Sequence, residues 1–170
     1  MTYGTKKIAF LGLMLAIALI LALIERMFPS FPMLPPQFGR IGLSNVIVMY
    51  LVFFMGKKEA ITVAFLKSLF VVLIRGPLAG LLSLSGGLLS VFLILLLWWV
   101  FKDKISYVAL SIAGAIGHNV GQLVVFGLIM QEWRLFIIYL PILLITGAIF
   151  GTVTGIFLKI IMPIFNRIYR

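Results

Sequence analysis

The stretch Gly114-Ala-Ile-Gly117-His118-Asn119-Val-Gly121-Gln122 lies inside an otherwise apolar run, residues 105–130. It holds the chain's single histidine, an asparagine and a glutamine, interleaved with small residues. In a helix, His118 and Gln122 lie one turn apart, and Asn119 and Gln122 share a neighbouring face. Two compatible interpretations follow. The stretch packs against another helix through small residues and interhelical hydrogen bonds, or it forms one wall of a polar pocket inside a membrane protein.

The composition around this stretch is that of an integral membrane protein. Of the 170 residues, 64% are hydrophobic and 11% are charged, whereas soluble domains have about 25% charged residues. The net charge of +10 does not indicate nucleic-acid binding, because the basic residues stand in small groups at the ends of apolar runs. The absence of cysteine excludes disulfides, a thiol nucleophile and a cysteine metal site.

The apolar runs predict an all-α fold of six transmembrane helices in a single domain. The first run follows Lys6-Lys7 as in a signal peptide, but it lacks a clear cleavage site, so we expect a retained helix. The second and third runs are short for a straight span, so these helices are irregular and tilted beside a cavity, or they extend further. The expected helices are residues 8–24, 41–55, 60–74, 78–101, 105–130 and 135–161.

Residues 26–40 connect the first two predicted helices. They include four prolines, which stop a regular helix, and several phenylalanines that make the segment too apolar for an ordinary solvated loop. We expect a proline-rich outer loop at the membrane interface. It is either a passive connector or a lid over a site.

The basic residues predict the orientation. Six spans put both termini on one side, which carries nine basic residues in short segments, against four on the other. The basic bias places the N- and C-termini in the cytoplasm of a multi-pass protein in the cell membrane, which we expect to be bacterial. The nine are Lys6, Lys7, Lys57, Lys58, Lys102, Lys104, Lys159, Arg167 and Arg170; the four are Arg26, Arg40, Arg75 and Arg134.

The small number of acidic residues argues against enzyme activity. The chain has four, Glu25, Glu59, Asp103 and Glu132, and no two are close in sequence. A magnesium site for diphosphate chemistry normally needs clustered acids. His118 has no evident triad partners, and no Gly-rich loop ends in Gly-Lys-Ser/Thr. We therefore expect no enzyme activity, no metal and no cofactor.

Polar residues at membrane depth point instead to a binding site. Lys67 lies near the middle of a predicted helix, where a lysine costs about 2.5–3.5 kcal/mol. It needs a partner: Glu25, Glu59 or a bound anion. Glu59 is eight residues away and is better explained as an acid at a helix N-terminus. The serines of the fourth helix either line the site or bond back to their own helix. The candidate substrate-binding residues are Asn45, Lys67, Arg75, Ser85, Gly86, His118, Asn119 and Gln122.

Five motifs in order resemble one family. They are Gly42-Leu-Ser-Asn45, Gly56-Lys-Lys-Glu59-Ala, Ser83-Leu-Ser-Gly-Gly-Leu-Leu-Ser90, Gly114-Ala-Ile-Gly-His-Asn-Val-Gly-Gln122 and Tyr139-Leu-Pro-Ile-Leu-Leu. Together they resemble the Gx transporter family, also named heptaprenyl diphosphate synthase component I, from about Lys6 to Gly155. Lys67 departs from the arginine that we expect there, which keeps the charge but not bidentate anion recognition.

That family is distantly similar to the S-components of energy-coupling factor transporters. The resemblance implies a six-helix bundle with cytoplasmic termini, a pocket toward the outer face for vitamin-like compounds, and a long first loop that helps to close it. It also implies energising by a separate membrane subunit and two ATPases. The S-component first helix carries an Ala-xxx-Ala face for that membrane subunit, which Ala18 and Ala22 match in form.

The leading hypothesis is an S-component-like protein that binds and helps to move a small molecule, vitamin-like or related to quinones and isoprenoids. The alternative is a non-catalytic membrane component of polyprenyl diphosphate or menaquinone synthesis, or of quinone-linked electron transfer. In that case the partner would be a soluble prenyltransferase subunit.

Overall fold

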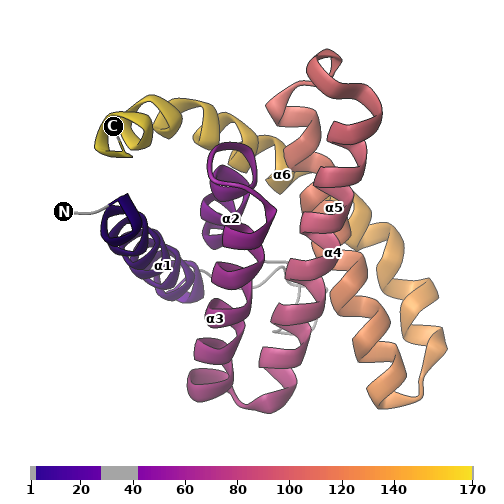
Figure 1. The fold of residues 1–170 in the computed structure, drawn as a ribbon. Helices are drawn as coiled ribbons and strands as arrows, with labels where there is room; N and C mark the ends of the chain where they lie inside the picture. Colours follow the sequence, from indigo (N-terminus) through magenta and orange to yellow (C-terminus); the bar gives the residue numbers. More distant parts are fainter. Residues whose placement is uncertain (1–2, 28–41, 170) are drawn as a thin grey trace.

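Six α-helices make up most of the part of the chain described by this computed structural model, residues 3–27 and 42–169 (Figure 1). They are α1 Tyr3–Met27, α2 Leu43–Phe54, α3 Lys57–Arg75, α4 Pro77–Phe101, α5 Tyr107–Met130 and α6 Trp133–Tyr169, with the short 3₁₀-helix η1 Lys102–Lys104 before α5. All six predicted helices are confirmed, but α1, α3 and α6 extend beyond residues 8–24, 60–74 and 135–161. The expected outer loop lies, from residue 28 to residue 40, outside the described residues.

The outer surface of the bundle is apolar, as a lipid environment requires. Leu73, Trp99 and Ile137 are 80%, 77% and 74% exposed. By length and composition α1, α4, α5 and α6 are each able to cross a membrane. The remaining two helices differ from simple spans, because α2 has 12 residues and α3 carries charges at both ends and Lys67 between them.

From α2 onward, the connections between consecutive helices alternate between the two ends of the bundle (Figure 1). At one end, Gly76 joins α3 to α4 with a left-handed φ of 88°, which glycine adopts without strain, and Pro77 opens α4. At the other end, the Ser106 hydroxyl accepts the Ala109 N–H at 3.1 Å and caps α5. Both chain termini lie at the same end, in agreement with an even number of passes (Figure 1).

The short helix α2 is at the centre of the fold. Residues 46–52 are buried on every side, which fits a helix that is apolar all round. The Tyr50 ring lies 4.9 Å from Phe54, 5.0 Å from Phe165 and 6.3 Å from Phe10, measured between ring centroids. These contacts join α2 to α1 and to the C-terminal part of α6, which turns toward the N-terminal end of α1 in Figure 1.

Helix α5 packs tightly against both α4 and α6 because glycines line the contacts. A Cβ atom on Gly121 would lie 2.7 Å from the Ser85 carbonyl oxygen of α4, and one on Gly151 of α6 would lie 2.6 Å from the Ile112 Cα. The backbones therefore approach more closely than any side chain would allow. The same α5–α6 contact contains a buried hydrogen bond of 3.0 Å between the Ser111 and Thr154 hydroxyls.

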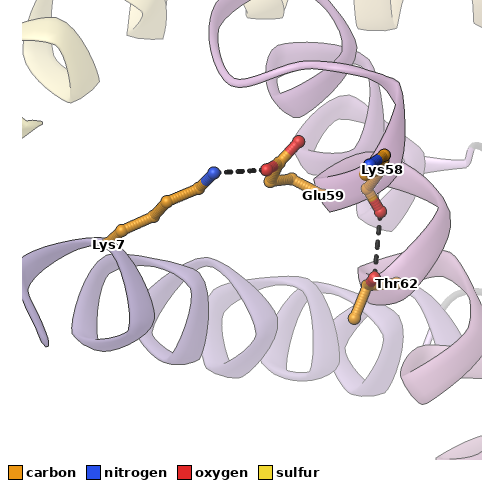
Figure 2. Close-up of polar contacts among 4 residues, drawn as sticks. All are labelled: Lys7, Lys58, Glu59 and Thr62. Carbon is orange, nitrogen blue, oxygen red and sulfur yellow. Dashed lines mark hydrogen bonds and ion pairs between the residues drawn. The ribbon is translucent and has the colours of Figure 1, made fainter. Parts of the chain in front are cut away.

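An ion pair joins α1 to α3 at the end of the bundle where the termini lie (Figure 2). The Lys7 ammonium lies 2.5 Å from the Glu59 carboxylate in the first turn of α3. Next to it, the Thr62 hydroxyl donates to the Lys58 carbonyl at 2.9 Å. The hydrogen bond from Lys7 lowers the pKa of Glu59 below its ordinary value. The expectation that Glu59 is an N-terminal acid of a helix is confirmed, with Lys7 as its partner.

Candidate functional site

A cavity lies where α1 and α3 end, where α2 and α4 begin, and beside the middle of α5. Its empty volume is about 840 Å³, including the space at its open mouth. Small-molecule sites combine mainly apolar walls with a few polar groups, and this cavity has both. The described lining residues are Ala22, Leu23, Glu25, Gly42, Ser44, Asn45, Lys67, Phe70, Val71, Ile74, Arg75, Ala79, Leu82, Ser83, His118, Asn119 and Gln122.

Lys67 lies in the cavity wall and is only 3% exposed. Its ammonium donates to the Asn45 side-chain oxygen at 2.5 Å and to the Ser44 hydroxyl at 3.3 Å. Both partners belong to the first turn of α2, so these bonds fix the start of α2 against the middle of α3. A membrane protein tolerates a buried charge that is hydrogen-bonded to such polar partners or faces a water-filled cavity.

Glu25, near the end of α1, also lines the cavity. Its carboxylate accepts the backbone N–H of Gly42, the residue that precedes α2 and has a left-handed φ of 79°. This bond brings together the two ends of the segment that connects α1 to α2. Arg75, in the last turn of α3, also lines the cavity.

The α5 stretch supplies the third wall through His118, Asn119 and Gln122. Asn119 also donates from its side-chain nitrogen to the Leu143 carbonyl of α6 at 2.9 Å. The buried Nδ1 of His118 has no hydrogen-bond partner in the described structure. Both interpretations of this stretch therefore apply, because it packs against its neighbouring helices and also lines the cavity.

Two of the eight predicted site residues lie elsewhere. Ser85 donates its hydroxyl to the Leu82 carbonyl of its own helix at 3.0 Å, and it is absent from the described cavity wall. Gly86 faces the His118 ring, where a Cβ would come within 2.7 Å of Nδ1. Both lie in the α4–α5 packing contact, and their part in substrate binding stays a prediction. The other six line one cavity.

The two alanines of α1 that are expected to face a partner subunit point inward in the structure. Ala18 is fully buried, and Ala22 lines the cavity, so this pair faces the interior of its own chain. Gly12 and Ala16, another small-residue pair of α1, are exposed. Both small-residue pairs have the same spacing, so the sequence alone does not distinguish which of them faces outward.

Sequence reasoning did not select several lining residues, although a signal for some was present. Phe70, Val71 and Ile74 follow Lys67 at helical spacing and form one continuous face of α3 with it. Extending that face from the charged residue would have found them. Ser44 gave no such signal, because its role depends on where α2 meets α3.

The described cavity wall offers a ligand a small set of polar groups. Glu25 is the one carboxylate among the described lining residues. The described part of the chain also contains no group of three histidine, cysteine or acidic residues that could hold a metal ion. What the cavity offers a ligand is one buried ammonium, further hydrogen-bonding groups and an apolar wall.

Comparisons with known proteins agree with this architecture. One solved structure, described as "Structure and mechanism of the S component of a bacterial ECF transporter", matches with a TM-score of 0.57 and 23% sequence identity, over 96% of this chain and 95% of the other. At this identity the match establishes the fold. No curated protein matches in sequence. A family model described as heptaprenyl diphosphate synthase component I matches residues 14–161. The chain therefore belongs to the heptaprenyl diphosphate synthase component I family and has the fold of a transporter S component.

Proposed function

We propose that this protein is the substrate-binding subunit of a membrane transporter, and that it receives a small molecule in the cavity between α1 and α5. The observation that carries the proposal is the cavity itself. Six polar or charged side chains selected from the sequence line it, inside a bundle with an apolar outer surface. The fold supports the same role, because it is that of a protein described as the S component of a transporter.

Energy for transport would come from other subunits. The sequence contains no Gly-Lys-Ser/Thr phosphate loop, so ATP hydrolysis of that type belongs to a separate protein. We propose a transmembrane partner together with ATPases, in the cell membrane of a bacterium, with both termini of this chain in the cytoplasm. Recovery of ATPase subunits with the tagged protein from its native membrane would support this assignment.

The direct test is enrichment of a metabolite. Protein purified from its native membrane in lipid nanodiscs should carry a small molecule that mass spectrometry detects above an unrelated membrane protein. Ala79→Trp, which fills the cavity from α4, should abolish the enrichment. Leu81→Trp is the matched control, because Leu81 lies on the same helix and is 51% exposed on the outer surface. Absence of any enriched compound from the wild-type protein would contradict the proposal.

The family description favours a second candidate, a non-catalytic membrane component of polyprenyl diphosphate or menaquinone synthesis. In that case the same cavity would hold an isoprenoid or quinone, and a soluble prenyltransferase would be the partner. The pull-down separates the candidates, since recovery of a prenyltransferase without ATPases would favour the second.

A further inference from the structure

Lys67 carries a buried positive charge, and its hydrogen-bond acceptors are uncharged. Its two hydrogen bonds go to the Asn45 amide oxygen and to the Ser44 hydroxyl. An ammonium has three N–H donors, so one donor has no acceptor among the described residues. A charge at this depth is stabilised most by an opposite charge, and the cavity is where such a group could reach it.

The chain itself has little negative charge to supply. Of its four acidic residues, Glu59 pairs with Lys7 at the far end of the bundle, Asp103 lies in η1, and Glu132 is exposed between α5 and α6. Glu25 alone among them lines the cavity, against the two cations Lys67 and Arg75. The segment 28–41, which connects α1 to α2, contains in its sequence one basic residue, Arg40, and no acidic residue. The described cavity wall thus has an excess of one positive charge.

The backbone adds to this positive potential. Gly42, Ser44 and Asn45 line the cavity, so the N-terminal turn of α2 faces it, and a helix N-terminus carries a partial positive charge. Phe70, Val71 and Ile74 form an apolar part of the cavity wall on α3, on the same helix face as Lys67. The cavity wall therefore combines the N-terminal turn of α2 and two cations of α3 with an apolar stretch of α3 that lies between those cations in sequence.

We infer that the ligand of this cavity is an amphipathic monoanion, with a single carboxylate at the Lys67 ammonium and the first turn of α2, and an apolar body along Phe70, Val71 and Ile74. This inference rests on the proposed function and specifies its substrate class. One negative charge on the ligand balances the excess positive charge of the described cavity wall. A neutral ligand would leave the excess uncompensated, and a phosphate dianion would reverse it.

The experiment compares three polar head groups attached to the same apolar group, in two series of compounds. 2-Naphthoate, 2-naphthamide and 2-naphthyl phosphate, and the octyl series octanoate, octanamide and octyl phosphate, are titrated against the nanodisc protein, with the thermal unfolding midpoint as readout. In at least one series the carboxylate should bind at least tenfold more tightly than the amide and the phosphate. Lys67→Met should remove that preference, and Lys67→Arg should retain it.

Equal binding of carboxylate and amide, preference for the phosphate, or no binding in either series would overturn the inference. The enrichment experiment separates this outcome from failure of the proposed function. An enriched neutral compound would keep the transport role and reject the monoanion, whereas no enriched compound would reject the role itself. If Lys67→Met does not fold, the comparison of head groups on the wild-type protein still decides the inference.

Discussion

The contacts among α4, α5 and α6 differ from the cavity wall in what fills the space between helices. In the former, glycines such as Gly121 and Gly151 bring backbones together until no Cβ fits. In the latter, long polar side chains such as Lys67 and Glu25 reach across to the start of α2. The first arrangement fixes helix positions by close contact. The second depends on hydrogen bonds whose members can be exchanged with less disturbance of the fold.

The largest effect should come from enlarging a glycine in the tight region. Gly151→Val would place its side chain against the Ile112 Cα of α5, and backbone atoms cannot rotate away. We expect a loss of more than about 3 kcal/mol in unfolding free energy, or no folded protein. Gly12→Val is the control, because nothing lies within 4 Å of a Cβ at Gly12. Equal stability of the two variants would show that the helices are not fixed by this contact.

A smaller effect is expected from Asn45→Leu in the cavity wall. The variant leaves the Lys67 ammonium with Ser44 as its one hydrogen-bond partner among the described residues. Hydrogen bonds to charged groups contribute about 1.5–3 kcal/mol, and the unfolding free energy in a mixed-micelle titration should fall by that amount. Adding Lys67→Met should restore most of the lost unfolding free energy, because this second substitution removes the buried charge that lacks a hydrogen-bond partner. A double variant as unstable as Asn45→Leu would assign the loss to packing instead.

Asn119 contacts α6 and also lines the cavity. Asn119→Ala should lower the unfolding free energy by less than Asn45→Leu does. It removes the hydrogen bond to the Leu143 carbonyl, and interhelical bonds of this type in membranes contribute about 0.6 kcal/mol on average. Gln122→Ala is the matched control, since Gln122 lines the same wall. If Gln122→Ala destabilised the protein as much in the same titration, the Asn119–Leu143 bond would not be the cause.

The smallest effect should come from the ion pair far from both regions. Glu59→Gln should lower the unfolding free energy by about 0.2–0.5 kcal/mol, because the Lys7 side chain is 36% exposed and solvent screens the pair. The folded-state pKa of Glu59 lies below its ordinary value of 4.5. The contribution is therefore complete above that value and lost as the pH falls through the lowered pKa. Unfolding midpoints of wild type and variant should converge at acidic pH, and a constant difference would exclude this origin.

The sequence predicted the helices better than the residues around the cavity. Apolar runs and basic turns located all six helices, because lipid requires long apolar segments and charged ends. Helical spacing also grouped His118, Asn119 and Gln122 on one wall. The role of Ser44 and the inward position of Ala18 depend on how one helix is rotated against another. Tertiary packing determines that rotation, and helical periodicity alone does not reveal it.

The short central helix has a consequence for the biogenesis of this protein. Twelve residues of α2 extend about 18 Å, well short of the hydrocarbon thickness of about 30 Å. The insertion machinery therefore cannot release α2 into lipid as an independent segment, and we expect α2 to enter as a hairpin with α3. Its burial is completed by Phe165 of α6, which is synthesised after α5. A chain interrupted after α5 would leave α2 incompletely covered, which would make it a target for membrane quality control.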